Sequence, residues 1–338
     1  MIRPVVLSLS LALALSPGMI PAAGSTELLV GNKSADTVWR LSTDDGRKLG
    51  EFATGQGPHE IVVSSDGRTA LVSNYGSQSP GSSLSVLDLA GGGAARSIDL
   101  GDNTRPHGMR LMPGNKRAVV TTEGSRKLLV VDIEKAKVDS AIDLGEGRGH
   151  MVALSVDGAT AYVTKIDAGT VSRVDLKAGR KTHEVAAGAG AEGVAVHPRS
   201  GEVWVSNREA GTVTVHDPAT LAVRATVPSP GFPIRVVFTA DGRHALATNA
   251  RAATLSVIDV EGKRVIQTVD LSRKGAQYSQ TMLGRAALPI GVIADPSGKR
   301  VYVAISGGDE IAVVDTARWQ VVGQWKTGRE PDALGVVP

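Results

Sequence analysis

One unit of about 42 residues recurs along most of this 338-residue chain. Its first half is two short runs of alternating apolar residues around a turn with Gly, Asn or Ser, which predicts a β-hairpin. A third run that ends in Asp and a fourth run follow, so each unit predicts four antiparallel strands, as in a propeller blade. Six copies align without gaps over the hairpin: PHEIVVSSDGRTALVSN from Pro58, PHGMRLMPGNKRAVVTT from Pro106, GHMVALSVDGATAYVTK from Gly149, AEGVAVHPRSGEVWVSN from Ala191, PIRVVFTADGRHALATN from Pro233 and PIGVIADPSGKRVYVAI from Pro289.

The two ends of the chain complete a seventh unit. PDALGVVP, from Pro331, matches only a first strand, whereas ELLVGN, TVWRLS and KLGEFATG, between Glu27 and Gly55, match the second, third and fourth. Joining these pieces closes the ring and removes the free sheet edges of an open array. The sequence therefore predicts an all-β, seven-bladed β-propeller that forms a single domain over residues 25–338.

Several strand segments carry a family resemblance. VWVSN (Val203 to Asn207), AYVTK (Ala161 to Lys165), VYVAI (Val301 to Ile305) and the recurrent VLDL, VVDI, RVDL and VIDV resemble the YVTN-family β-propeller repeat. The resemblance covers nearly the whole chain after residue 24 and implies the propeller fold. Proteins with such repeats include lactonase-like enzymes, cell-surface proteins and periplasmic binding proteins, so the resemblance leaves the function open.

The N-terminus predicts export. Arg3, an apolar run from Val5 to Leu15, and the small residues Ala22 to Gly24 have the order of a secretory signal peptide, residues 1–24. The run is too short to span a bilayer as a helix, so a soluble periplasmic or secreted protein that begins near Ser25 is expected. Cysteine is absent, which excludes disulfides and thiolate metal ligands. With 37 basic against 34 acidic residues and 3% aromatics, nucleic acid is an improbable partner.

The first strand of each blade is expected to line the central channel. Pairing around the turn at Asp66 and Gly67 places His59 opposite Asn74, at the face called the top. The residues equivalent to His59 form a ring at the channel mouth, with five polar members from adjacent blades and two apolar ones. In blade order the ring reads Asp332, His59, His107, His150, Glu192, Ile234 and Ile290.

Further polar residues are expected around this ring. They lie at the second-strand ends, just after them, or in a long insertion at residues 272–285 that should emerge on the top face, where loops carry function. The predicted ligand-binding residues are Asn74, Glu123, Lys165, Asn207, Arg208, Asn249, Arg251, Tyr278 and Asp332.

The ring supports more than one chemistry. His59, His107, His150 and Glu192 form a ligand set suited to Zn²⁺, Cu²⁺ or another divalent ion. The first hypothesis is therefore a binding propeller for a metal or a small polar ligand that is accessory to another exported protein. The same residues could instead be catalytic in a metal-dependent, lactonase-like hydrolase or a lyase, or a histidine could act as general base while Lys165 or Arg208 holds an anionic substrate. A third hypothesis is a protein-interaction scaffold, whose histidines merely line a hydrated channel.

Other recurrent residues are predicted to be structural. An Asp ends the third strand in six blades, and Asp-Gly turns recur at Asp66, Asp157 and Asp241, positions typical of turn formation. Four histidines fall outside the ring and are expected to be structural or solvent-exposed: His183, His197, His216 and His244.

Overall fold

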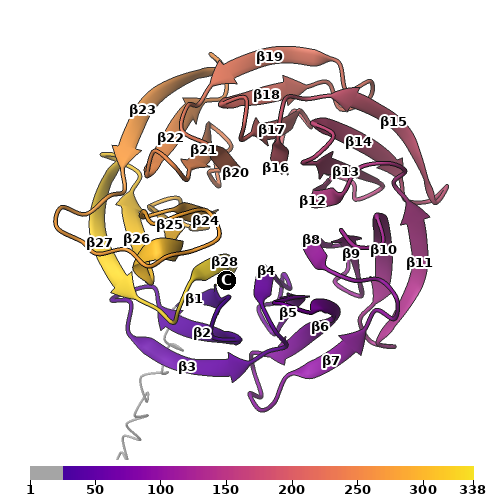
Figure 1. Cartoon of the computed structure of the whole chain (residues 1–338), viewed down its shortest axis with the longest axis horizontal. Helices are drawn as coiled ribbons and strands as arrows, with labels where there is room; N and C mark the ends of the chain where they lie inside the picture. Colours follow the sequence, from indigo (N-terminus) through magenta and orange to yellow (C-terminus); the bar gives the residue numbers. More distant parts are fainter. Residues whose placement is uncertain (1–25) are drawn as a thin grey trace, which may run out of the picture.

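The computed structural model describes residues 26–338, so the predicted signal peptide lies outside the described residues. Seven four-stranded antiparallel sheets surround a central channel (Figure 1), which confirms the predicted seven-bladed propeller. No helix within residues 26–338 has the length and apolarity to cross a membrane. The one helical element of this part of the chain is a short 3-10 turn, η1 (Ser306–Gly308).

In blades 1 to 6 the strands run from the channel to the rim in chain order, and in blade 7 the last strand of the chain is innermost. Blade 1 contains β4 (Pro58–Val63), β5 (Thr69–Gly76), β6 (Pro80–Asp88) and β7 (Arg96–Asp99). Blade 2 contains β8 (Pro106–Leu111), β9 (Arg117–Thr122), β10 (Lys127–Asp132) and β11 (Lys137–Asp143). Blade 3 contains β12 (Gly149–Leu154), β13 (Thr160–Lys165), β14 (Thr170–Asp175) and β15 (Arg180–Ala186).

The remaining four blades follow the same plan. Blade 4 contains β16 (Ala191–Val196), β17 (Val203–Asn207), β18 (Thr212–His216) and β19 (Val223–Pro228). Blade 5 contains β20 (Pro233–Phe238), β21 (His244–Asn249), β22 (Thr254–Asp259) and β23 (Arg264–Asp270). Blade 6 contains β24 (Pro289–Ala294), β25 (Arg300–Ile305), β26 (Glu310–Asp315) and β27 (Gln320–Lys326). Blade 7 contains β28 (Pro331–Val337), β1 (Glu27–Asn32), β2 (Thr37–Ser42) and β3 (Lys48–Ala53).

Blade 7 joins the two ends of the chain. The last strand, β28, pairs antiparallel with β1, and Leu334 lies opposite Val30. Leu334 is 9% exposed and belongs to an apolar cluster with Leu28, Leu41 and residues of blade 6. The ring is therefore closed by backbone pairing and by burial of apolar side chains between neighbouring blades.

The first strand of each blade contains a β-bulge that the sequence did not reveal. Pro58, not His59, is paired with Asn74, and the pairing resumes one residue out of step at Ile61 and Val72. The predicted partner of Asn74 was therefore wrong by one residue. The same shift recurs in the other six blades. A bulge re-aims side chains, and here it turns the mouth residues toward the channel.

Hydroxyl groups of second strands hold the mouth residues of the following blade. Thr121 donates to the carbonyl oxygen of His150 at 2.5 Å, and Thr248 donates to that of Ile290 at 2.9 Å. Thr164 makes the same bond to Glu192, and Ser206 makes it to Ile234 at 2.9 Å. These buried side chains thus bind adjacent inner strands together directly below the mouth.

The aspartates at the third-strand ends make turns, as predicted. Asp88 accepts hydrogen bonds from the backbone amides of Ala90 and Gly91, and Asp217 accepts them from Ala219 and Thr220. The Asp-Gly turns are built in the same way, since Asp66, Asp157 and Asp241 each accept from the amide two residues ahead. These carboxylates therefore stabilise the turns in which they lie.

Closure can be tested by placing a charge in the seam. Leu334→Asp would bury an unpaired carboxylate between blades 6 and 7, and it is expected to lower the free energy of unfolding by about 3 kcal/mol or more. Val322→Asp, on the outer strand β27 where Val322 is 57% exposed, should change it by less than about 0.5 kcal/mol. Urea unfolding followed by circular dichroism measures both, and equal effects would contradict the closure argument.

Candidate functional site

Three imidazole rings from neighbouring blades lie side by side at the mouth. Each histidine is the second residue of the inner strand of its blade: His59 of β4, His107 of β8 and His150 of β12. The ring centroids of His59 and His107 are 4.1 Å apart, and those of His107 and His150 are 3.7 Å apart. The approach of His107 and His150 depends on Gly108, since a Cβ there would come within 2.6 Å of the carbonyl oxygen of His150. The predicted convergence of these three residues is thus observed.

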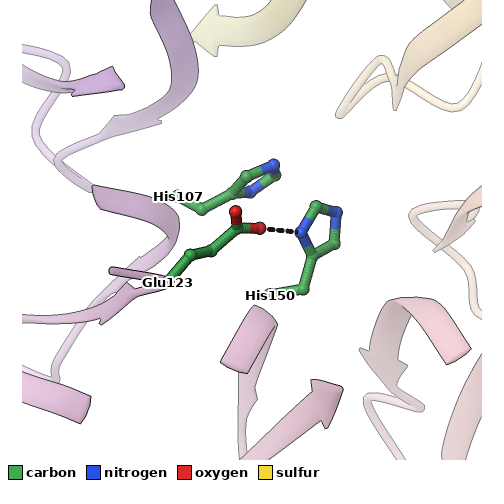
Figure 2. Close-up of side chains that lie close together, drawn as sticks. All are labelled: His107, Glu123 and His150. Atoms are coloured by element: carbon green, nitrogen blue, oxygen red, sulfur yellow. Dashed lines mark hydrogen bonds and ion pairs between the residues drawn. The ribbon is translucent and has the colours of Figure 1, made fainter. Parts of the chain in front are cut away.

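Glu123 completes a cluster with two of the histidines. It directly follows β9 and directs its carboxylate between His107 and His150 (Figure 2). One oxygen lies 2.5 Å from Nδ1 of His150, and the other accepts a 2.6 Å hydrogen bond from the hydroxyl of Tyr75. One ligand atom from each of His107, Glu123 and His150 lies within 4.8 Å of the others, a grouping that could hold a metal ion.

The two outer acids of the arc are also in place. Oδ2 of Asp332 lies 2.7 Å from Nδ1 of His59, and Lys33 approaches the same oxygen at 3.8 Å. At the other end, Oε1 of Glu192 lies 3.5 Å from Nε2 of His150, and its second oxygen accepts a 3.0 Å hydrogen bond from Arg208. Five consecutive blades therefore supply one continuous arc of polar side chains, as predicted.

Hydrogen bonding separates the mouth histidines from the other buried histidines. In His197 and His216, which are 4% and 0% exposed, both ring nitrogens have partners. In contrast, Nδ1 of His107 and Nε2 of His150 are buried with no hydrogen bond within residues 26–338. A buried polar atom without a partner costs free energy, which a bound ligand would recover.

The cluster holds its imidazoles in different charge states. Burial lowers the pKa of His107 well below its ordinary value, and the neighbouring histidines lower it further. Burial acts in the same direction on His150, but its contacts with Glu123 and Glu192 outweigh it and raise the pKa. For Glu123, burial opposes ionisation, yet the bonds from His150 and Tyr75 lower its pKa to about 2. Burial thus favours the neutral form of His107, whereas the neighbouring carboxylates favour the protonated form of His150.

The opposite side of the mouth is apolar. Ile234 and Ile290 belong to a buried cluster with Phe232, Ala250 and Leu288. Arg251 lies over the ring of Phe232, 3.8 Å from its centroid, and Arg208 lies 5.2 Å from it. The predicted division of the mouth into a polar arc and an apolar wall is therefore present, with both arginines beside the apolar wall.

Several predicted ligand-binding residues instead point into the blades. Asn74, 2% exposed, donates to Ser83 and Ser85 of its own blade. Asn207 and Asn249 bond in the same way to Thr212 and Thr214 and to Thr254 and Ser256. Lys165 is fully buried, and its ammonium donates to two backbone carbonyls and to Glu184. These side chains connect strands, so the structure does not bring them to the mouth cluster.

The insertion at residues 272–285 is anchored to blade 6. The amide of Ser279 donates to Gly307 of η1 at 2.8 Å, and Arg273 lies 3.4 Å from Glu310. Tyr278 is partly buried against the apolar cluster between blades 5 and 6, where its hydroxyl accepts a hydrogen bond from the Arg273 amide. The loop thus lies along blade 6, and Tyr278 packs within this anchored loop.

The site contains residues absent from the predicted set. Tyr75 lies near the end of β5 and packs edge-on against His59, with ring centroids 5.0 Å apart. Lys33 directly follows a second strand, as Glu123 does, so position alone could have identified it. Glu60 and Arg235 follow mouth residues and form an ion pair with each other. Simple strand alternation would have turned these last two away from the channel, and only the bulge explains their placement.

Glu123→Gln tests the charge states. In protein treated with a chelator, losing the carboxylate is expected to lower the pKa of His150 and to leave His107 neutral at pH 7. Nitrogen-15 NMR of the imidazoles against pH measures this. Glu261→Gln, on an exposed turn, is the control. An unchanged His150 titration in Glu123→Gln would show that the pair does not set its charge.

The same pair predicts a pH dependence of stability. His150 has a raised pKa in the fold, so its contribution is full below its ordinary value of 6.5 and is lost as pH rises through the raised value. Glu123 has a lowered pKa, so its contribution is present above 4.5 and is lost as pH falls toward about 2. The Glu123→Gln variant should therefore lose most stability, relative to wild type, between about pH 4.5 and 6.5, as measured by urea unfolding.

Comparisons with known proteins agree with this fold. The YNCE-like beta-propeller family matches residues 157–282. The chain is 29% identical over 216 residues to the uncharacterized protein YncE of Salmonella typhi, a match that covers 62% of this chain and 59% of that protein. It is 28% identical over 207 residues to the protein NirF of Stutzerimonas stutzeri, covering 58% and 49%. The matched regions thus span less than two thirds of either relative.

Solved structures show the same architecture. Hydrazine synthase of Kuenenia stuttgartiensis superimposes with a TM-score of 0.71 at 19% identity, covering 82% of this chain and 88% of that one. A functionally unknown protein from Desulfotomaculum acetoxidans DSM 771 superimposes with a TM-score of 0.75 at 15% identity, covering 92% and 98%. At these identities the likeness concerns the fold alone. The repeats and the closed ring show a seven-bladed β-propeller, and the sequence matches support its similarity to YNCE-like propellers over part of the chain.

Proposed function

We propose that this protein is an exported binding propeller that holds a divalent transition-metal ion at the mouth of its channel. The observation that carries the proposal is the grouping of ligand atoms from His107, Glu123 and His150 within 4.8 Å of one another, together with the buried Nδ1 of His107, which has no hydrogen-bond partner within residues 26–338. Imidazole and carboxylate together suit Zn²⁺, Cu²⁺ and related ions. His59 stands next to His107 as a further ligand.

The surroundings of the cluster also favour a cation. Asp332 and Glu192 at the two ends of the arc are 4% and 5% exposed, and both carboxylates have a lowered pKa despite their burial. Tyr75 and Arg208 hold the outer oxygens of Glu123 and Glu192. Such outer contacts orient metal ligands and raise affinity.

Metal titration of the chelator-treated protein tests the proposal. Wild type is expected to bind one equivalent of Zn²⁺ or Cu²⁺ by isothermal titration calorimetry, and His107→Ala and His150→Ala should each weaken binding at least about tenfold. His183→Ala is the matched control, because His183 is exposed on the outer strand β15. Metal binding that survives in both mouth variants, or is lost equally in His183→Ala, would overturn the assignment.

Export is the second part of the proposal and is supported by the charged, apolar and small segments of residues 1–24. N-terminal sequencing of the protein recovered from the periplasm or the culture medium is expected to show a start near Ser25. Recovery of full-length protein from the cytoplasm alone would contradict it.

A metal-dependent hydrolase is the second candidate, favoured by the neutral state of His107. A metal ion would lower the pKa of its bound water, and a neutral imidazole beside it could accept a proton. Turnover of a lactone or ester panel that is lost with chelator and in His107→Ala would identify this activity. Stoichiometric metal binding without turnover would leave the binding function alone.

A further inference from the structure

A cavity lies in the channel below most of the mouth ring. It has a volume of about 350 Å³ and is lined mainly by residues further along the inner strands than the ring, together with Asp332 of the ring itself. Its charged lining residues are Glu60, Arg110, Arg235 and Asp332. A cavity of this size accommodates a small organic molecule.

An ion pair crosses the channel and forms the upper boundary of this cavity. Arg235 comes from β20 of blade 5, and its Nη2 donates to Glu60, on β4 of blade 1. These strands lie on opposite sides of the central opening (Figure 1). Asp332 stands next to this pair, with Oδ1 4.0 Å from Nη2 of Arg235. The cavity thus adjoins the histidine arc through Asp332, whose other carboxylate oxygen contacts His59.

Both guanidinium groups keep free donors. Within residues 26–338, Nε and Nη1 of Arg235 donate to no acceptor, although the residue is only 7% exposed. Arg110 donates a single hydrogen bond, from Nη1 to the carbonyl oxygen of Met109. An arginine fork offers five N–H donors that match the two oxygens of a carboxylate.

Arg110 has no carboxylate partner of its own. Arg235 pairs with Glu60 and lies 4.0 Å from Asp332, whereas Arg110 forms no ion pair within residues 26–338. The charge of Arg110 therefore remains without a dedicated partner. Consistent with this, burial lowers the pKa of Arg110, and Arg235 lowers it further against the opposing effect of Glu60. An enclosed cation of this kind favours an anionic ligand.

The rest of the cavity lining is apolar, which restricts the chemical class of anion that the cavity can bind. Val63, Val194, Val237, Ile293 and Leu334 are among the side chains around the two arginines. Inorganic phosphate has no surface that could use such contacts, whereas a short aliphatic chain would bury apolar area there. We propose that the lower channel binds a small monocarboxylate, with its carboxylate on Arg110 and Arg235 and its aliphatic end against these side chains.

Calorimetric titration with butyrate tests the proposal, using full-length mature protein treated with a chelator so that the result does not depend on metal. Butyrate is expected to bind with one-to-one stoichiometry, and n-butanol and inorganic phosphate at least about tenfold more weakly. Arg110→Gln should weaken butyrate binding at least about tenfold, and Arg110→Lys should weaken it less. Arg318→Gln, at an exposed arginine of blade 6, is the control.

Folding of the variants is checked by thermal unfolding and by Zn²⁺ affinity, which Arg110→Gln should leave unchanged. The proposal is overturned if butyrate produces neither heat nor a stabilising shift, if n-butanol or phosphate binds as well as butyrate, or if Arg110→Gln binds butyrate like wild type. Loss of metal binding with retained butyrate binding would refute the mouth site alone, so the two proposals fail separately.

Discussion

The geometry of the mouth depends on hydrogen bonds between adjacent inner strands. A Thr or Ser near the end of a second strand donates to the carbonyl of the mouth residue in the next blade, as Thr121 does for His150. Because each bond is buried and joins two blades, it fixes the spacing of neighbouring mouth residues as well as the packing of the sheets. The 3.7 Å approach of the His107 and His150 rings follows from this spacing together with the close approach at Gly108.

A rigid ring of this kind can hold the cluster of His107, His150 and Glu123 in place although the burial of unsatisfied polar atoms costs free energy. Nδ1 of His107 is buried without a hydrogen-bond partner in the described part of the chain, and an isolated loop would relax to remove that cost. Here every member lies near the start of an inner strand or directly follows a second strand, so none moves without distorting a blade. The arrangement is therefore preorganised for a ligand, which is the property that favours tight and selective metal binding.

The sequence predicted the fold and the polar arc because both follow from counting equivalent positions in a repeat. Once seven copies were aligned, His59, His107, His150, Glu192 and Asp332 had to occupy one level of one ring. Side-chain direction was less predictable. Asn74 and Lys165 end second strands near the mouth, yet they bond within their own blades, and nothing in a single repeat distinguishes these orientations. The bulge adds a residue without changing repeat length, so the turn-based register missed it, and with it the roles of Glu60 and Arg235.

The ion pair between Arg235 and Glu60 affects how the central opening of the closed ring can be used. The backbone of a propeller alone suggests an open channel through which solutes could pass from one face to the other. A guanidinium from blade 5 and a carboxylate from blade 1 instead meet across this opening and join its two sides. A solute that moves from one face to the other must therefore pass this ion pair.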